Sequence, residues 1–183
     1  MCKISAILIT IILLTLSGCG NAAYIPGNLK YSENLSPPDS DSKSGYWTVD
    51  EDIELYHFSQ GHDDKAPVLM LHGGPAMPFS EPWPALENIN NYKFIYFHQR
   101  GCGKSTVPFN DFESKNYKKN MDLMESKLGM GRYLEDIEKI RQLLEIDKLI
   151  LLGHSFGGFM AILYAIEFPE NVEKIILIEP ADM

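Results

Sequence analysis

The stretch Gly153-His154-Ser155-Phe156-Gly157-Gly158 decides the fold, because of what lies on either side of it. The apolar run of residues 148–152 precedes it and predicts a buried strand, and the apolar-striped run of residues 156–168 predicts a helix. The serine therefore stands at the apex of a sharp strand-to-helix turn. Glycines are expected two residues to either side, because a Cβ at Gly153 or Gly157 would collide with neighbouring backbone.

Such a turn gives the serine the surroundings of a nucleophile. It lifts Ser155 Oγ clear of the sheet and places the backbone N–H of Phe156 beside it, at the N-terminus of the helix. An N–H in that place would stabilise an oxyanion. The pattern G-x-S-x-G is frequent by chance, so the strand before it and the helix after it are what make Ser155 the predicted nucleophile.

A second glycine-rich turn lies earlier in the chain. Residues 66–71 (Ala-Pro-Val-Leu-Met-Leu) predict a short buried strand that runs into His72-Gly73-Gly74-Pro75. A strand that ends in a glycine-rich loop ahead of the serine is where a second oxyanion N–H is expected, here that of Gly74. An ordinary strand-ending turn would use the same residues, but the order of the two motifs favours the oxyanion interpretation.

With a third motif, these residues resemble the α/β-hydrolase fold and, within it, the proline iminopeptidase branch of serine hydrolases. That branch shows His-Gly-Gly-Pro-Gly, then Asp-Gln-Arg-Gly-x-Gly-x-Ser, then the serine turn. This chain has Ala76 where the branch has the last glycine of the first motif, and residues 98–105 read His-Gln-Arg-Gly-Cys-Gly-Lys-Ser, with His98 in place of aspartate. The resemblance covers roughly residues 45–180.

The resemblance implies roles for particular residues. Ser155 would be the nucleophile, and Phe156 and Gly74 would supply the oxyanion N–H groups. Gln99 and Arg100 would brace the site without reacting.

The resemblance also implies an α/β fold with a central, mostly parallel sheet and helices on both faces, truncated here after about the sixth strand. The residue pattern predicts an antiparallel pair at 45–49 and 53–58, further strands at 91–98 and 173–178, a helix beginning at Ser80, a loop with an uncertain helix at 109–131, and a core-packed helix at 134–144. The charged residues along that last helix are expected to face solvent: Arg132, Glu135, Glu138, Lys139 and Arg141.

The catalytic machinery is expected to be incomplete. The order in this fold is serine, then acid, then histidine, and residues 156–183 contain no histidine. Without a base, a serine hydroxyl is a poor nucleophile, so this chain alone is expected to be inactive. We expect it to be the N-terminal part of a larger hydrolase, and leave open whether a truncated record, an interrupted gene or a decayed copy accounts for that.

Upstream histidines offer weak substitutes for the base. The side chain of His154 is expected to diverge from the neighbouring serine, and His72 is expected to hold the oxyanion loop. His98, at a strand end near the site, is the remaining candidate. For the acid, Glu179 or Asp182 could serve, although a solvent-facing carboxylate is the plainer interpretation of both.

The front of the chain resembles a bacterial lipoprotein signal over residues 1–18. Lys3 precedes a short apolar run, which closes on Leu16-Ser17-Gly18-Cys19. Cys19 is expected to be diacylated, which places the exported protein in the bacterial cell envelope, anchored through lipid. A simple secretory signal with a chance cysteine is the alternative. Residues 19–44 are predicted to be a flexible tether, and residues 45–183 the incomplete hydrolase domain.

Composition excludes several classes of partner. Sixteen Lys and Arg against 25 Asp and Glu give a net charge of −9, which argues against nucleic-acid binding and against electrostatic docking on anionic lipid. No metal-ligand spacing is visible, and neither a metal nor a cofactor is expected. No disulfide is expected, because Cys2 would be removed with the signal and Cys19 acylated, which leaves Cys102 alone.

These observations predict a serine hydrolase with an acyl-enzyme mechanism, and the resemblance implies an aminopeptidase acting on short peptides with N-terminal proline. The alternatives are an esterase or amidase of the same fold, taking small acyl substrates, and a non-catalytic, hydrolase-like envelope lipoprotein. The oligomeric state is left open.

Overall fold

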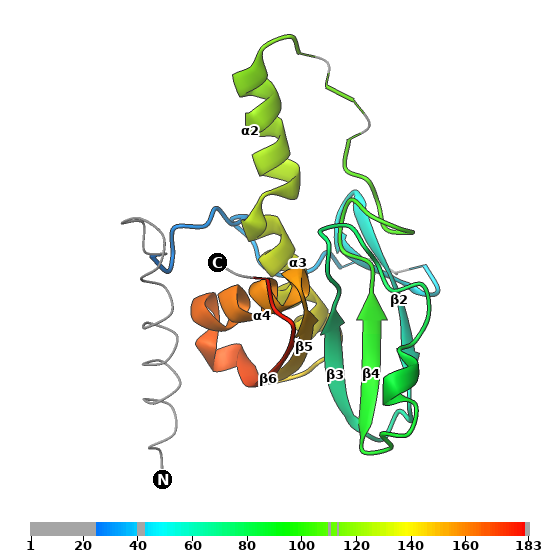
Figure 1. The fold of residues 1–183 in the computed structure, drawn as a ribbon. Coiled ribbons are helices and arrows are strands. Elements are labelled where there is room, and N and C mark those ends of the chain that lie inside the picture. Colours follow the sequence, from blue (N-terminus) through cyan, green and yellow to red (C-terminus); the bar gives the residue numbers. More distant parts are fainter. Residues whose placement is uncertain (1–24, 40–42, 110, 113, 182–183) are drawn as a thin grey trace.

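The structure is a computed structural model that describes residues 25–39, 43–109, 111–112 and 114–181 (Figure 1). The predicted signal, the lipidation site Cys19 and the acid candidate Asp182 lie outside these ranges. No helix in the described ranges is long and apolar enough to cross a bilayer.

A six-stranded sheet in the order β1-β2-β4-β3-β5-β6 forms the centre of the fold. The first two strands run antiparallel to each other, β2 is also antiparallel to β4, and the pairs β3–β4, β3–β5 and β5–β6 are parallel. The strands are β1 (Tyr46–Asp50), β2 (Ile53–Gln60), β3 (Ala66–Leu71), β4 (Tyr92–Phe97), β5 (Leu149–His154) and β6 (Val172–Ile178).

Parallel pairing brings the carboxyl ends of four strands to one edge of the sheet. The loops that leave this edge begin at His72 after β3, His98 after β4, Ser155 after β5 and Glu179 after β6. In open α/β sheets, ligands bind at the carboxyl ends of the strands. Topology alone therefore gathers all three sequence motifs at the edge where a site is expected.

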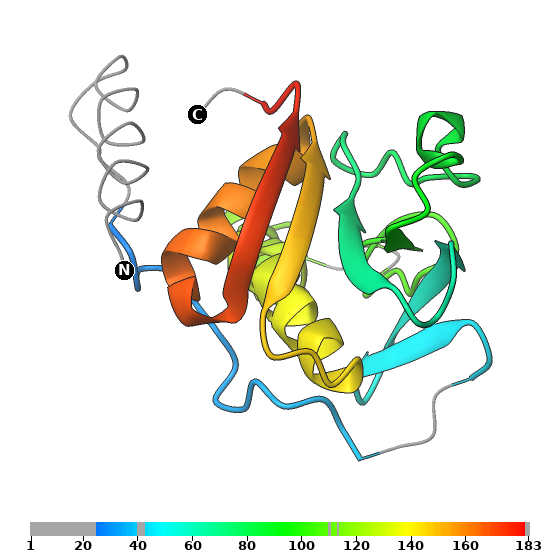
Figure 2. The same cartoon turned by 90° about the horizontal axis from the view of Figure 1, so that it is seen from below.

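The two faces of the sheet are covered differently. Helices α3 (Met130–Leu143) and α4 (Phe156–Glu167) lie on the same face, as Figure 2 shows. Their apolar stripes pack on Leu69, Ile95, Phe97 and Leu151. The opposite face carries Phe79, Trp83 and Leu86, from a loop that holds the short 3₁₀ helix η2 (Pro84–Leu86), packed on Val68, Met70, Tyr96 and Leu152.

Most of the predicted elements are confirmed, with each end within four residues of its predicted position. The antiparallel pair is β1 and β2, and the strands predicted at 66–71, 91–98, 148–152 and 173–178 are β3, β4, β5 and β6. The expected helix start at Ser80 is wrong, because Ser80 and Glu81 form a bend in a loop and the short 3₁₀ helix begins only at Pro84. A second 3₁₀ turn, η3 (Pro169–Asn171), joins α4 to β6.

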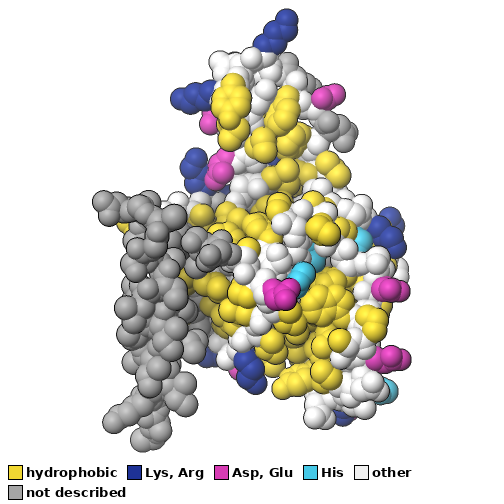
Figure 3. Space-filling model, in the orientation of Figure 1, with side chains coloured by type: hydrophobic (Ala, Val, Ile, Leu, Met, Phe, Trp, Pro, Cys, Tyr) yellow, Lys and Arg dark blue, Asp and Glu magenta, His cyan; other side chains and the backbone are white. Residues whose placement is uncertain are grey.

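The region 109–131, expected to be a loop with an uncertain helix, contains α2 (Tyr117–Leu128), which buries none of its residues. Tyr117, Met121 and Met124 are exposed on one stripe of this projecting helix, where Figure 3 shows hydrophobic side chains gathered. The helix joins the body through its last turn, where Arg100 donates to Lys127 O over 3.3 Å. Weak patterning in the sequence thus reflects a helix with little core to face.

The solvated face expected along α3 is wrong, because most of its charged residues are buried. Glu135 is 0% exposed, Lys139 2% and Glu138 5%. Each has polar partners: Glu135 accepts from Ser32, Lys139 pairs with Asp50, and Glu138 accepts from Tyr164 OH. Segments distant in sequence cover this side of the helix, which its own periodicity could not reveal.

One of those segments is part of the predicted tether. Residues 25–39 contain no helix or strand but lie along α3 and α4, as the blue trace in Figure 2 shows. Tyr31 OH donates to Glu167 over 3.0 Å, and Gln142 donates to Leu35 O over 3.3 Å. The part of the tether that the structure describes therefore contacts the domain.

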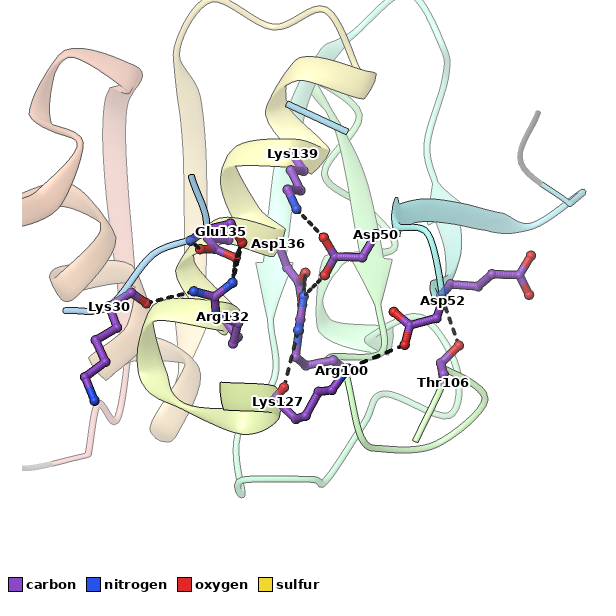
Figure 4. Close-up of polar contacts among 12 residues, drawn as sticks. Lys30, Asp50, Asp52, Arg100, Thr106, Lys127, Arg132, Glu135, Asp136 and Lys139 are labelled. Atoms are coloured by element: carbon purple, nitrogen blue, oxygen red, sulfur yellow. Dashed lines mark hydrogen bonds and ion pairs between the residues drawn. The ribbon is translucent and has the colours of Figure 1, made fainter. Parts of the chain in front are cut away.

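A buried ion network ties the loop after β4 to the rest of the fold (Figure 4). Arg100, 2% exposed, donates to both oxygens of Asp136 at 2.7 and 2.5 Å and to Asp50 at 3.0 Å. Burial works against the charged form of Arg100, but the two carboxylates raise its pKa. Burial also works to raise the pKa of Asp50, but its pairs with Lys139 and Arg100 outweigh burial and lower it.

Candidate active site

Ser155 stands at the apex of the turn between β5 and α4, with φ 52° and ψ −119°. Positive φ is unfavourable for a residue with a Cβ, and such strain persists only where the surrounding structure imposes it. Here the imposing contacts are backbone hydrogen bonds: Ser155 N–H donates to Ile178 O over 3.0 Å, and Ser155 O accepts from Gly158 N–H over 2.9 Å. The turn is therefore locked from both sides.

The glycines around Ser155 are required by close backbone approach, as expected from the sequence. A Cβ at Gly157 would overlap Leu71 O, and a Cβ at Gly153 would overlap Gly157 O. The first contact matters for the site, because it presses the start of α4 against the end of β3. The two glycine-rich motifs are thereby brought together.

The proposed oxyanion N–H groups lie at this junction. Within the described ranges, neither Phe156 N–H nor Gly74 N–H donates to another protein atom. The loop also abuts the serine directly, since a Cβ built on Gly73 would lie 3.1 Å from Ser155 Cβ. Two unpaired donors beside a raised serine are the arrangement that stabilises a tetrahedral oxyanion.

Backbone conformation explains the glycines of the loop and one departure from the family motif. Gly74 has φ +118°, and a Cβ there would lie 2.8 Å from both Ala76 N and Met77 N. Ala76 has φ 64°, a left-handed conformation that glycine adopts more readily. Ala76 therefore holds a backbone conformation that would suit the glycine of the family motif.

Gln99 and His72 hold the glycine-rich loop after β3 through hydrogen bonds. His72 is fully buried; its Nδ1–H donates to Gly73 O at 2.9 Å, and its Nε2 accepts from Gln99 N–H at 3.1 Å. The side-chain amide of Gln99 donates to His72 O at 3.1 Å. Gln99 thus touches the loop twice, while Arg100 turns away into the ion network; of the two residues expected to brace the site, only Gln99 contacts it.

His98 uses both ring nitrogens inside the fold. Its Nε2–H donates to Phe79 O at 3.0 Å, and its Nδ1 accepts from Lys104 N–H at 2.9 Å. Neither nitrogen is left to take a proton from Ser155. His154 packs its ring against Trp83, with the ring centres 5.5 Å apart. The structure brings Ser155, Phe156, Gly73 and Gly74 together but joins no histidine to the serine by a hydrogen bond among the described residues.

Cys102 is a poor alternative to Ser155 as a nucleophile, because its thiol is buried and hydrogen-bonded. It is 6% exposed, and its thiol donates to Gln99 O over 3.2 Å. Burial raises the pKa of the Cys102 thiol to about 11, which disfavours the reactive thiolate. Across the described residues no cluster of three or more His, Cys, Asp or Glu could hold a metal ion.

The buried histidines predict how stability depends on pH. Burial lowers the pKa of His72 to about 4 and also lowers that of His98. Histidine in the unfolded chain has a pKa of about 6.5. Below that pH, the unfolded chain therefore binds protons that these two histidines do not bind in the folded protein. The stabilisation is fully present above about pH 6.5, and His72 contributes a loss of up to about 1.4 kcal/mol per pH unit as pH falls from there toward 4; His98 contributes a loss in the same direction.

Urea unfolding between pH 7 and 4.5 measures this slope. The variant His72→Asn should flatten it. Equal slopes for the unmodified protein and this variant would contradict the assignment.

Comparison with known proteins places this geometry in a family. The family described as alpha/beta hydrolase fold matches residues 66–183, which include the glycine-rich loop after β3, the Gln99 loop and the Ser155 turn. The chain belongs to the α/β-hydrolase fold family.

Two relatives of this α/β-hydrolase-fold chain are named as proline iminopeptidases. It is 36% identical over 133 residues to a Mycoplasma genitalium protein provisionally named proline iminopeptidase, and 33% identical over 134 residues to the proline iminopeptidase of Neisseria meningitidis. Each match covers 73% of this chain and 39% of the relative, so the chain spans well under half the length of these relatives.

A solved structure agrees with these matches. The crystal structure of a proline iminopeptidase-related protein from Thermus thermophilus superposes with a TM-score of 0.56 at 26% identity, covering 74% of this chain and 44% of that one.

Proposed function

We propose that this protein is a serine hydrolase that works through an acyl-enzyme, with Ser155 as the nucleophile. The observation that carries the proposal is the strained Ser155 turn, φ 52°, with the unpaired N–H groups of Phe156 and Gly74 beside it. Ser155 Oγ attacks the substrate carbonyl carbon, and the two N–H groups receive the charge that develops on its oxygen. The leaving group departs, and water then hydrolyses the acyl-serine. We assign no general base among the described residues.

We further propose that the substrates are short peptides with N-terminal proline. Support comes from relatives 33% identical to this chain that are named proline iminopeptidase. The same catalytic turn would also serve an esterase or amidase, so the leaving group has to be tested directly.

Hydrolysis of two chromogenic substrates tests both parts. The protein is expressed from its complete open reading frame, and this protein is called the full gene product. Its hydrolysis of proline p-nitroanilide and of p-nitrophenyl acetate is measured. We expect turnover of both, with the proline substrate preferred in kcat/KM. Turnover of the ester alone would favour an esterase, and turnover of neither would favour a non-catalytic hydrolase-like protein.

We also propose that Cys19 carries a lipid that anchors the exported protein in a bacterial cell envelope. The support is the sequence Leu16-Ser17-Gly18-Cys19 after a short apolar run. Palmitate labelling of the expressed protein should be lost in Cys19→Ala; labelling that persists would contradict the proposal.

A further inference from the structure

One stripe of the projecting helix α2 exposes large apolar side chains. Tyr117 is 76% exposed, Met121 43% and Met124 39%, and their helical spacing places them on one face. Phe112, in the loop just before the helix, is 45% exposed as well. Single apolar side chains on a surface need no explanation, but a group of this kind marks an interaction site.

The tip of the same helix, residues 114–121, is positively charged. It contains Lys115, Lys118 and Lys119 and no acidic residue. All three lysines are exposed, and their side chains make no ion pair with another described residue. Two of them, Lys118 and Lys119, lie in the first turn of α2, where the helix dipole disfavours a cation. The stability of the helix therefore does not explain these lysines, which are a local exception to the net charge of −9.

An apolar stripe flanked by lysines is typical of a helix that lies in the surface of a bilayer. In such a helix, aromatic and other apolar side chains enter the boundary between headgroups and acyl chains, and lysines attract anionic headgroups. The stripe and the tip of α2 together match both parts of that surface.

The geometry also suits the bilayer that a lipid on Cys19 would occupy. Ile25 follows Cys19 by six positions, so the two residues lie within about 20 Å of each other. Further along the same segment, Lys30 and Tyr31 line one pocket with Asp122 of α2. The 12 residues of α2 extend over about 18 Å. The lipid anchor and the tip of α2 can therefore reach one bilayer.

We propose that α2 is a membrane-contacting helix, whose apolar stripe and tip lysines dock on a bilayer that contains anionic lipid. Figure 1 shows α2 projecting past the edge of the sheet at which β3 and β4 end, which is the edge that carries Ser155. Docking through α2 would turn this edge toward the bilayer. The inference goes beyond the proposed function and requires neither the hydrolase activity nor the lipid on Cys19.

Binding to vesicles tests the proposal with the full gene product expressed from Gly20, which carries no lipid. The vesicles are phosphatidylcholine with about one third phosphatidylglycerol, and we expect Lys118→Glu/Lys119→Glu to weaken binding about 10- to 100-fold. These changes favour the helix dipole, so melting of α2 could not explain the loss. The matched control, Lys65→Glu/Lys148→Glu, makes the same change in net charge immediately before β3 and β5, at the opposite edge of the sheet. It should bind nearly as the unmodified protein does.

A second variant tests the apolar stripe. Met121→Gln/Met124→Gln keeps the length and helix propensity of both side chains and removes apolar surface. Neither methionine is buried, so the fold should not change. We expect binding to the same vesicles, measured by sedimentation, to weaken at least about 10-fold.

Several outcomes would overturn membrane docking through α2. They are no vesicle binding by the unmodified protein, no loss in one of the two α2 variants, and an equal loss in the control variant. Self-association without vesicles that the methionine variant abolishes would assign the stripe to a second copy of the chain instead. Hydrolysis in solution should be the same in all these proteins, so a failure of the proposed function is seen separately.

Discussion

Replacing Ser155 with alanine is expected to lower turnover by the full gene product about 10⁵- to 10⁶-fold, the loss typical when a serine hydrolase loses its nucleophile. The reason is local: Ser155 Oγ is the only atom of the turn that can form the acyl ester. KM should change little, because the groups that surround the substrate remain. Steady-state hydrolysis of the substrate preferred by the unmodified protein measures the loss.

A glycine at the same position separates chemistry from stability. Ser155 has φ 52°, so Ser155→Gly should relieve backbone strain and raise the free energy of unfolding by about 1 kcal/mol, while activity is lost as fully as in the alanine variant. Urea unfolding of the three proteins gives the comparison. Substantial activity in either variant would contradict the assignment of the nucleophile.

The second large effect is expected at Arg100. Changing Arg100 to methionine should lower the free energy of unfolding by about 3–5 kcal/mol, because Asp136 would remain buried without its cation and Asp50 would keep only Lys139. Arg100 also caps the last turn of α2 through Lys127 O, so that helix should become less ordered. Urea unfolding, followed by circular dichroism, measures both changes.

The matched control is the exposed ion pair between Lys127 and Asp52, whose side chains are 38% and 65% exposed. Lys127→Met should cost less than about 1 kcal/mol. In the Arg100→Met background, Asp136→Asn should recover part of the loss, since it removes one uncompensated charge. Equal costs for the Arg100 and Lys127 variants would show that the buried network does not stabilise the fold.

The elements that could be predicted from the sequence are those specified by local residue patterns. Strands β3 and β5 are short apolar runs between turn residues, and the Ser155 turn is specified by glycines whose reason is steric and local. The strand-to-helix turn at Ser155 and the glycine-rich loop beside it could therefore be predicted from the chain alone. The prediction of a helix beginning at Ser80 failed because a serine followed closely by proline is also common in loops.

Non-local contacts account for what could not be predicted. The charged residues of α3 repeat as a solvated stripe would, yet residues 27–35 and Asp50 cover them, and neither segment is near α3 in sequence. Arg100 follows Gln99 directly and yet turns into that network, because successive side chains in an extended loop diverge. The strained φ of Glu179 likewise depends on bonds to Ser155 that join distant parts of the chain.

Covalent labelling tests the central claim most directly. The full gene product is treated with a fluorophosphonate, digested and analysed by mass spectrometry. We predict a single phosphonylated peptide, the one that contains Ser155, and no adduct in the Ser155→Ala variant. An adduct on another residue, or hydrolysis of substrate by a protein whose Ser155 stays unlabelled, would contradict the account.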